Sequence, residues 1–94
     1  TPCNGINHAD WSADESFFLA TCEFSGEILK VDTATGTILA KLTLADGAMP
    51  QDLRLAPDGS KFYVADMEHG VLWVIAGDGS AITGSIATGW WEAR

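Results

Sequence analysis

The residues of this sequence that could do chemistry are few, and four of them form two matched pairs. His8 and Asp52 lie 44 positions apart, and Asp10 and Arg54 follow them two positions further on. In an extended strand residues two apart point the same way, so each pair would share one face of its strand. An imidazole beside carboxylates can hold a cation or a polar ligand, with His8 and Asp52 as the metal-ligand candidates. The structural alternative is that Arg54 pairs with Asp10 or Asp52, because a charge near an apolar interface needs a partner.

A second candidate set lies near short loops and comprises Glu23, Asp66, Glu68 and His69. Acids on exposed hairpin loops are usually solvated, so the simpler interpretation of this set is a polar surface. The run Gly77-Asp78-Gly79-Ser80 has an acid between glycines but lacks the further spaced acids of a calcium loop, and it predicts a turn.

The common catalytic signatures are missing from the chain. No GxSxG elbow, HExxH helix or phosphate-binding P-loop occurs, and we expect no cofactor. Cys3 and Cys22 lack the close spacing of a zinc or redox site. They are either two inert thiols or a single bridge, which would stabilise the fold by roughly 3 kcal/mol and imply an oxidising compartment.

Charge and hydropathy narrow the range of partners. The 94 residues include 13 acidic and 5 basic side chains, which gives a net charge of −8. Such a chain would be repelled by nucleic-acid phosphates and by anionic lipid surfaces, whereas a cation or a small neutral ligand fits better. No apolar run approaches the roughly 20 residues of a membrane-spanning helix, so we expect no membrane insertion. The beginning at Thr1 suggests a processed or cut chain.

The elements that must position these residues are indicated by an internal repeat. The sequence matches itself at an offset of 44 positions over two full units. Only the turn after the third apolar run is ambiguous, because Gly36 aligns with Gly79 at an offset of 43, which predicts that one residue was lost or gained there. The identities without a gap are Asp14/Asp58, Ser16/Ser60, Phe18/Phe62, Gly26/Gly70 and Ile38/Ile82.

Each unit contains four short apolar runs separated by turn residues. No stretch sustains the i, i+3, i+4, i+7 spacing of an amphipathic helix, so the runs predict strands. Pro57-Asp58-Gly59-Ser60 is a turn sequence, and its equivalent Ala13-Asp14-Glu15-Ser16 keeps the Asp without the Pro and Gly. The expected strands are His8–Trp11, Phe17–Cys22, Glu27–Asp32 and Ile38–Leu44, then Asp52–Ala56, Lys61–Asp66, Val71–Ile75 and Ala81–Thr88.

Four strands in about 44 residues is the period of a β-propeller blade, and strands that are apolar on both faces fit blades packed between neighbours. We therefore expect an all-β fold of two four-stranded antiparallel blades, residues 1–44 and 45–88. Residues 89–94 would form a C-terminal tail or the start of another blade. The alternative is a two-sheet sandwich of eight strands, which does not require its halves to repeat.

Two segments carry a family resemblance. The run from Pro50 to Asp66 (PQDLRLAPDGSKFYVAD) resembles the blade signature of YVTN-type propellers, and Lys30–Gly36 (KVDTATG) resembles the same family's turn between the third and fourth strands. The resemblance implies a propeller fold related to lactonase-like and surface-layer-type proteins, and an extracytoplasmic rather than a cytoplasmic location. In that fold the first strand of each blade lines the central channel, which would place His8, Asp52 and the residues beside them there.

Two blades are too few to close a ring, since propellers close at four to eight blades. A free pair would leave large apolar rows in water. We therefore expect either that three or four copies of the chain associate head-to-tail into a closed ring or that the chain is a piece of a longer propeller. The candidates to anchor such an interface are Trp73, Trp90 and Trp91, and the Trp90-Trp91 pair could instead pack locally or be a remnant of cutting the chain. The rows expected to be exposed are Phe18/Leu19, Ile28/Leu29, Val71/Leu72/Trp73 and Ile82/Ile86.

Three functions follow from this architecture. The first is a non-catalytic propeller unit, native or an excised or engineered fragment, that assembles with copies of itself and serves as a scaffold or binding module. The second is a fragment of a lactonase-like enzyme acting on a sugar-acid lactone, in which His8 with Asp52 or Asp10 would exchange protons. The third, a metal-dependent oxidoreductase or electron-transfer partner, rests only on His8 and His69.

Overall fold

The computed structural model describes residue 3 and residues 5–88, and the description below concerns these residues. They form eight β-strands of six residues each and no helix. No helix able to cross a membrane occurs within this part of the chain. The strands are β1 (Ile6–Trp11), β2 (Phe17–Cys22), β3 (Glu27–Asp32), β4 (Ile38–Thr43), β5 (Pro50–Leu55), β6 (Lys61–Asp66), β7 (Val71–Ala76) and β8 (Ile82–Ala87).

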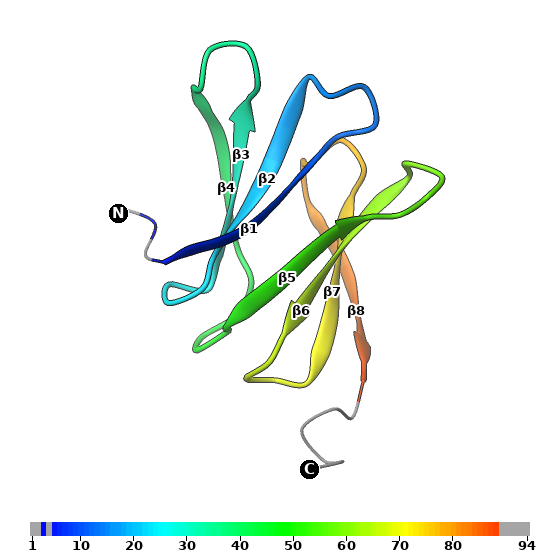
Figure 1. Ribbon diagram of the computed structural model, residues 1–94. Coiled ribbons are helices and arrows are strands. Elements are labelled where there is room, and N and C mark those ends of the chain that lie inside the picture. Colours follow the sequence, from blue (N-terminus) through cyan, green and yellow to red (C-terminus); the bar gives the residue numbers. More distant parts are fainter. Residues whose placement is uncertain (1–2, 4, 89–94) are drawn as a thin grey trace.

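The eight strands form two separate four-stranded sheets, in the orders β1-β2-β3-β4 and β5-β6-β7-β8 (Figure 1). Every neighbouring pair is antiparallel. Within each sheet short turns join consecutive strands, and connections this short produce antiparallel pairs. The expected strands are all present, with β1 and β5 each starting two residues earlier than expected.

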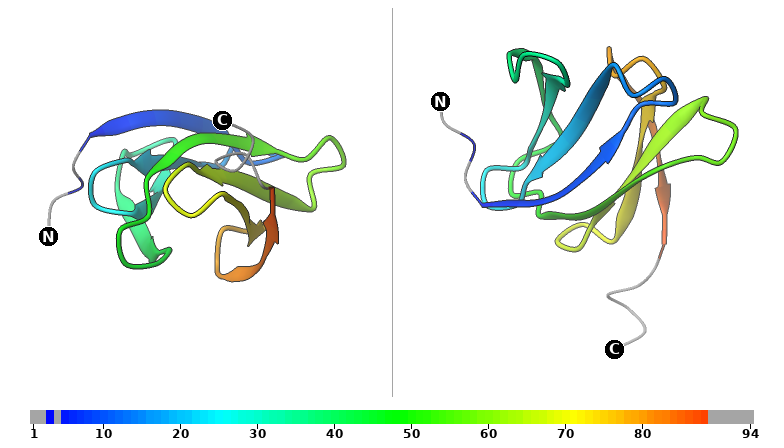
Figure 2. Two further views of the ribbon diagram at one scale, coloured as in Figure 1. Left: turned by 90° about the horizontal axis from the view of Figure 1, so that it is seen from below. Right: turned by 45° about the horizontal axis from the view of Figure 1, so that its top comes forward.

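The first strands of the two sheets lie side by side. Figure 1 shows β1 in blue and β5 in green next to each other, and in Figure 2 the sheets fan apart from these strands toward β4 and β8. Hydrogen bonds join them directly, including one from the Leu55 backbone N–H to the Asp10 carboxylate at 2.9 Å. The strands that carry His8 and Asp52 are therefore neighbours although they belong to different sheets.

An apolar core fills the space between the two sheets. Strand residues alternate between faces, so Phe17 and Leu19 of β2 face the second sheet while Phe18 faces away. Phe62 of β6 is fully buried opposite Phe17, and their ring centroids are 6.1 Å apart. The buried members of this core are Phe17, Leu19, Ile28, Leu44, Ala48, Leu53, Phe62, Val64 and Ile75.

The turn between the first two strands of each sheet has the same geometry despite different residues. Gly59 has φ +76°, and Glu15 takes the equivalent position with φ +62°. Asp14 and Asp58 each accept hydrogen bonds from the N–H and the hydroxyl of the serine two residues later. The first turn thus keeps the geometry and the Asp–Ser hydrogen bonds of the second, with Glu15 held in the left-handed conformation that Gly59 adopts without a side chain.

The prediction that one residue was lost or gained after the third strand is wrong. Val31 pairs with Ile38 in the first sheet and Ile75 with Ile82 in the second, so the offset stays at 44 on both sides of the turn. Only the position of the glycine within the loop differs. The Gly36 N–H bonds to the carbonyl four residues back and the Gly79 N–H to the carbonyl three residues back, which explains the apparent offset of 43.

The expected exposure of the apolar rows needs correction too. Leu19 and Ile28 are fully buried between the sheets, and Leu29 is buried on the outer face beside Cys22 and Val31. The large apolar side chains that are exposed within the described residues are Ile6, Trp11, Phe24, Ile38, Leu39 and Ile86.

Candidate functional site

The polar pairs expected from the sequence meet where β1 and β5 adjoin. His8 Nδ1 lies 3.9 Å from Asp52 Oδ1, and both side chains are nearly half exposed. The same Asp52 oxygen is 3.4 Å from Arg54 Nε and accepts the Leu53 N–H at 2.9 Å. The prediction that Arg54 pairs with Asp10 or Asp52 is thus realised with Asp52.

Asp10 has a different role from its neighbours because it joins the two sheets. One carboxylate oxygen accepts the N–H of Trp11 and the other accepts the N–H of Leu55 on β5, both at 2.9 Å. The backbone of β5 is thereby fixed against β1. Asp10 thus helps to hold the two strands side by side, close to His8 and Asp52.

Glu23, a candidate from the sequence, extends this row through two side-chain amides that the sequence did not single out, those of Asn7 and Gln51. Glu23, on the loop after β2, accepts hydrogen bonds from Asn7 Nδ2 at 3.2 Å and from Gln51 Nε2 at 2.8 Å. Asn7 Nδ2 also donates to the Gln51 carbonyl at 3.4 Å. Asn7 and Gln51 are themselves 44 positions apart, and this recurrence of a side-chain amide was the signal that could have revealed them.

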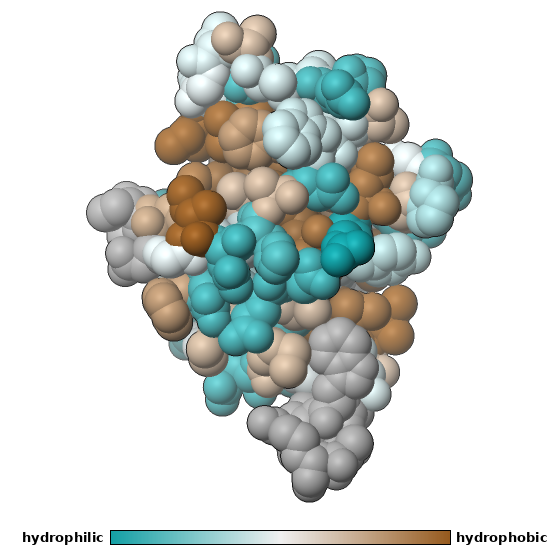
Figure 3. Space-filling model, viewed as in Figure 1, coloured by the Kyte–Doolittle hydropathy of each residue, from teal (hydrophilic) through white to brown (hydrophobic). Residues whose placement is uncertain are grey.

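The β1–β5 face is a polar, solvent-accessible surface with mixed charge. Figure 3 shows hydrophilic side chains gathered at the centre of the view, over the region where β1 and β5 meet. Amides, an imidazole, carboxylates and a guanidinium together can form hydrogen bonds with a polar ligand. Within the described part of the chain, no three His, Cys, Asp or Glu side chains come together as a metal site. A metal at His8 and Asp52 would therefore need further ligands from elsewhere.

Asp66, expected as a solvated loop acid, is instead fully buried at the end of β6. Its Oδ1 accepts the backbone N–H groups of Met49, Glu68 and His69, at 3.0 to 3.3 Å. Its Oδ2 accepts bonds from His69 Nδ1 at 2.7 Å and Trp73 Nε1 at 3.0 Å.

These partners decide the charge of Asp66. Burial raises the pKa of its carboxyl, but the hydrogen bonds from Trp73, Met49 and His69 lower that pKa, and the balance lies below the usual value. Because an ionised Asp66 only accepts hydrogen bonds, neutral His69 must carry its proton on Nδ1. Asp66 thus fixes the orientation of His69, whereas Glu68 remains an exposed loop residue.

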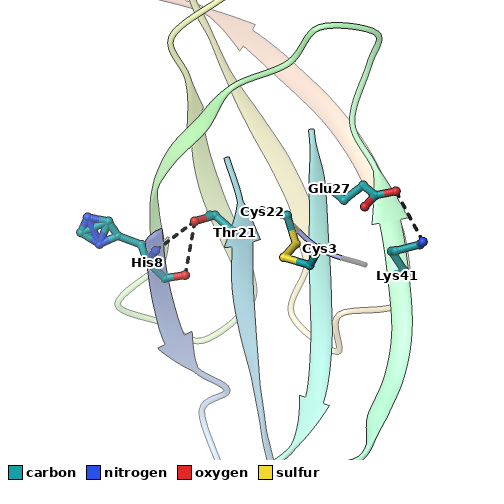
Figure 4. The surroundings of a disulfide bond; sticks show 6 residues. All are labelled: Cys3, His8, Thr21, Cys22, Glu27 and Lys41. Atoms are coloured by element: carbon teal, nitrogen blue, oxygen red, sulfur yellow. Dashed lines mark hydrogen bonds and ion pairs between the residues drawn. A yellow bond between two sulfur atoms is a disulfide. The ribbon is translucent and has the colours of Figure 1, made fainter. Parts of the chain in front are cut away.

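The two cysteines form a disulfide between the segment before β1 and the end of β2. Figure 4 shows the bridge beside Thr21, whose hydroxyl bonds to both the N–H and the carbonyl of His8. Thr21 is fully buried, so these bonds hold the β1 backbone at His8 in place. The bridge and Thr21 together fix the end of β1 that carries the polar row.

A shallow recess of about 300 Å³ lies between two turns that belong to different sheets. Its walls come from the β1–β2 and β7–β8 turns and include Asp14 and Asp78. Hydrogen bonds from Ser16 and Ser80 lower the pKa of Asp14 and of Asp78 respectively. Since each carboxylate is already bonded within its own turn, we assign the recess no ligand.

The tryptophans expected at an interface fall in two places. Trp73 is partly buried, packs against the core between the sheets and donates to Asp66. Trp90 and Trp91 lie outside the described residues, together with the rest of the segment 89–94.

Comparison with known proteins identifies the fold. No protein-family model matches the chain, and no curated protein sequence matches it. Among solved structures, hydrazine synthase from Kuenenia stuttgartiensis superposes with a TM-score of 0.81 at 20% identity, over 94% of this chain and 24% of that one. The periplasmic gluconolactonase of Pseudomonas aeruginosa gives a TM-score of 0.78 at 23% identity, over 93% and 28%.

The chain has the fold of two β-propeller blades. A putative 6-phosphogluconolactonase from Bacteroides fragilis agrees, with a TM-score of 0.76 at 20% identity over 94% of this chain and 27% of that one. We refer to β1–β4 as the first blade and to β5–β8 as the second. The chain spans about a quarter of the length of the structures it matches.

Proposed function

We propose that the chain is a non-catalytic repeat unit, of YVTN type, that assembles with two or three further copies into a closed β-propeller. The ring would act as a scaffold and binding module. The observation that carries this proposal is that β1 and β5, the first strands of the two sheets, lie side by side with an apolar core behind them. Further blades would continue this arrangement around an axis. Two blades cannot close that circle alone.

In such a ring the polar row on β1 and β5 would face the central channel. Each copy would add one His8, one Asp10, one Asp52 and one Arg54 to its wall. Arg54 lies 3.4 Å from Asp52 and offsets that carboxylate, whereas the charge of Asp10 has no cation beside it among the described residues of the same copy. The wall would therefore be acidic and would suit a small polar ligand or a cation better than an anion, and a cation would need ligands from several copies.

An extracytoplasmic location is part of the proposal. The Cys3–Cys22 disulfide supports it, because disulfides persist in oxidising compartments. One structural neighbour is a periplasmic protein, which agrees with this location.

Light scattering on a size-exclusion column, with and without a chelator, tests the assembly. The chain weighs 10.0 kDa, so three or four copies would give about 30 or 40 kDa at every concentration above the dissociation constant. A folded monomer at all concentrations would refute the proposal. Dissociation on chelation would place a metal among His8, Asp10 and Asp52.

A second candidate function is hydrolysis of a sugar-acid lactone. It is favoured by the proximity of His8 and Asp52, since an imidazole beside a carboxylate can accept a proton near neutral pH. Two structural neighbours bear the names of lactonases. The test is the pH-dependent hydrolysis of gluconolactone by the assembled protein. Loss of activity in His8→Ala would support this candidate, and an unchanged rate in that variant would exclude it.

A further inference from the structure

The two blades of the chain contact each other through two different surfaces, one on each blade. Because the blades are repeats, each outer face of the chain carries residues equivalent to one of these two surfaces. Phe62, Ile75 and Ile82 are cross-strand partners on β6, β7 and β8, and they pack against the first blade. Their equivalents 44 positions earlier are Phe18, Val31 and Ile38, which pair in the same register across β2, β3 and β4. We call Phe18, Val31 and Ile38 the leading face.

No blade covers the leading face in the isolated chain. Val31 is already buried beside Cys22 and Leu29 of its own blade, but Ile38 is 60% exposed, whereas its equivalent Ile82 packs against the core between the blades. The same residue type in the same register is thus in contact in one blade and in water in the other.

The opposite side of the chain mirrors this situation. Ile28 and Leu42 are cross-strand partners on the face of the first blade that meets the second. Their equivalents are Leu72 and Ile86, which pair in the second blade, and Ile86 is 50% exposed. We call Leu72 and Ile86, with Tyr63 beside them on β6, the trailing face.

We propose that the trailing face of one chain packs on the leading face of a second copy and repeats the internal blade–blade interface. This inference rests on the proposed ring and specifies how its copies meet. The occupant is a second copy because each free face is equivalent to one half of an interface that the chain already forms. A contact between two different faces is heterologous, and such contacts close into rings when the rotation divides the circle.

The charges on the inner strands favour the same arrangement. Inside the chain, Asp10 of β1 accepts the N–H of Leu55 on β5. At the contact between two copies, the residue equivalent to Asp10 is Arg54 of one copy, and the residue equivalent to Leu55 is Trp11 of the next copy. The proposed contact therefore brings Arg54 of one copy close to Trp11 of the next. The Trp11 N–H is already bonded to Asp10 Oδ1 of its own chain, so Arg54 would lie beside that carboxylate. A guanidinium thus meets an acid at the contact between copies, where a second Asp would be repelled.

Two single variants test the proposal, because each places a carboxylate on one of the two apolar faces. Ile38→Asp removes the leading face and Ile86→Asp removes the trailing face, and both positions are exposed, so each variant should keep its far-UV circular dichroism. In light scattering each variant alone should fall from the ring mass to that of the 10.0-kDa monomer. Phe24→Asp is the matched control, since Phe24 is 69% exposed on a loop and its equivalent in the second blade is the acid Glu68. That control should keep the ring mass.

Mixing the two variants decides the orientation of the contact. Ile38→Asp keeps an intact trailing face and Ile86→Asp an intact leading face, so an equimolar mixture should form a dimer of about 20 kDa that cannot grow. A mixture that stays monomeric would overturn the head-to-tail contact. Variants that keep the wild-type ring mass would overturn the assigned faces while leaving the ring itself intact. A monomeric wild type would overturn the ring.

Discussion

Cys22 and Asp66 occupy equivalent positions at the ends of β2 and β6, and each fastens its blade to the segment that precedes the blade's first strand. Cys22 does so through the disulfide to Cys3, and Asp66 through the hydrogen bond from the Met49 N–H at 3.0 Å. The backbone contact beside them is the same in both blades, from Glu23 N to Gly5 O and from Met67 N to Met49 O. One repeat thus solves the same structural problem with a covalent bond and the other with a buried carboxylate.

Reduction of the disulfide should destabilise the chain substantially. A bridge across 19 positions constrains the unfolded state, and its loss typically lowers the free energy of unfolding by about 3 kcal/mol. Urea unfolding with and without a reductant measures this, and the Cys3→Ala/Cys22→Ala double variant should match the reduced protein. An unchanged unfolding midpoint would show that the bridge contributes nothing.

Asp66→Asn should cost about 2–4 kcal/mol, because an amide cannot accept all five hydrogen bonds and would leave buried donors unpaired. Urea unfolding monitored by Trp fluorescence and by circular dichroism measures the loss. Asp78→Asn, at an exposed turn acid, is the control and should cost much less. Equal losses in the two variants would contradict the role assigned to Asp66.

Glu15→Gly should stabilise the protein by about 0.5–1 kcal/mol. Glu15 has φ +62°, a conformation that costs a residue with a side chain more than glycine, and the equivalent position is Gly59. Glu15→Ala keeps the strain and should bring no gain, which makes it the control. Thermal unfolding of the three proteins gives the ranking, and a less stable glycine variant would show that Glu15 is unstrained.

Acid should weaken the fold through its turn carboxylates. Hydrogen bonds from Ser60 lower the pKa of Asp58 below its value in the unfolded chain, and Thr35 does the same for the pKa of Asp32. A lowered folded pKa means that the stabilisation is complete above the unfolded pKa and is lost as the pH falls through the folded one. The stability difference between wild type and Asp58→Asn should therefore be constant near neutrality and shrink below about pH 4. A difference that grows on acidification would contradict this assignment.

Much of the fold was predictable from the repeat, whereas much of the site was not. The offset of 44 fixes which strands are equivalent, and so it predicted both four-stranded sheets and the closeness of His8 to Asp52. The burial of Asp66 could not be predicted, because its five donors come from the loop after β6, from the residue before β5 and from β7, which only the folded chain brings together. The same holds for Glu23, whose partners Asn7 and Gln51 lie on two different blades.

The pairing of Cys3 with Cys22 was open for a similar reason. Their spacing allows a bridge, but the choice depends on how the segment before β1 returns to the end of β2. The prediction of a lost or gained residue near Gly36 was wrong for a different reason. A glycine can take another position within a turn without changing the register of the strands around it.

The central claim is that these two blades belong to a closed ring of copies, and small-angle X-ray scattering tests it most directly. The isolated chain has a radius of gyration of 12.5 Å. Three or four copies packed compactly should give about 19–21 Å, with a forward scattering that corresponds to about 30 or 40 kDa. A radius near 12.5 Å and the mass of one chain, at concentrations up to the solubility limit, would contradict the account.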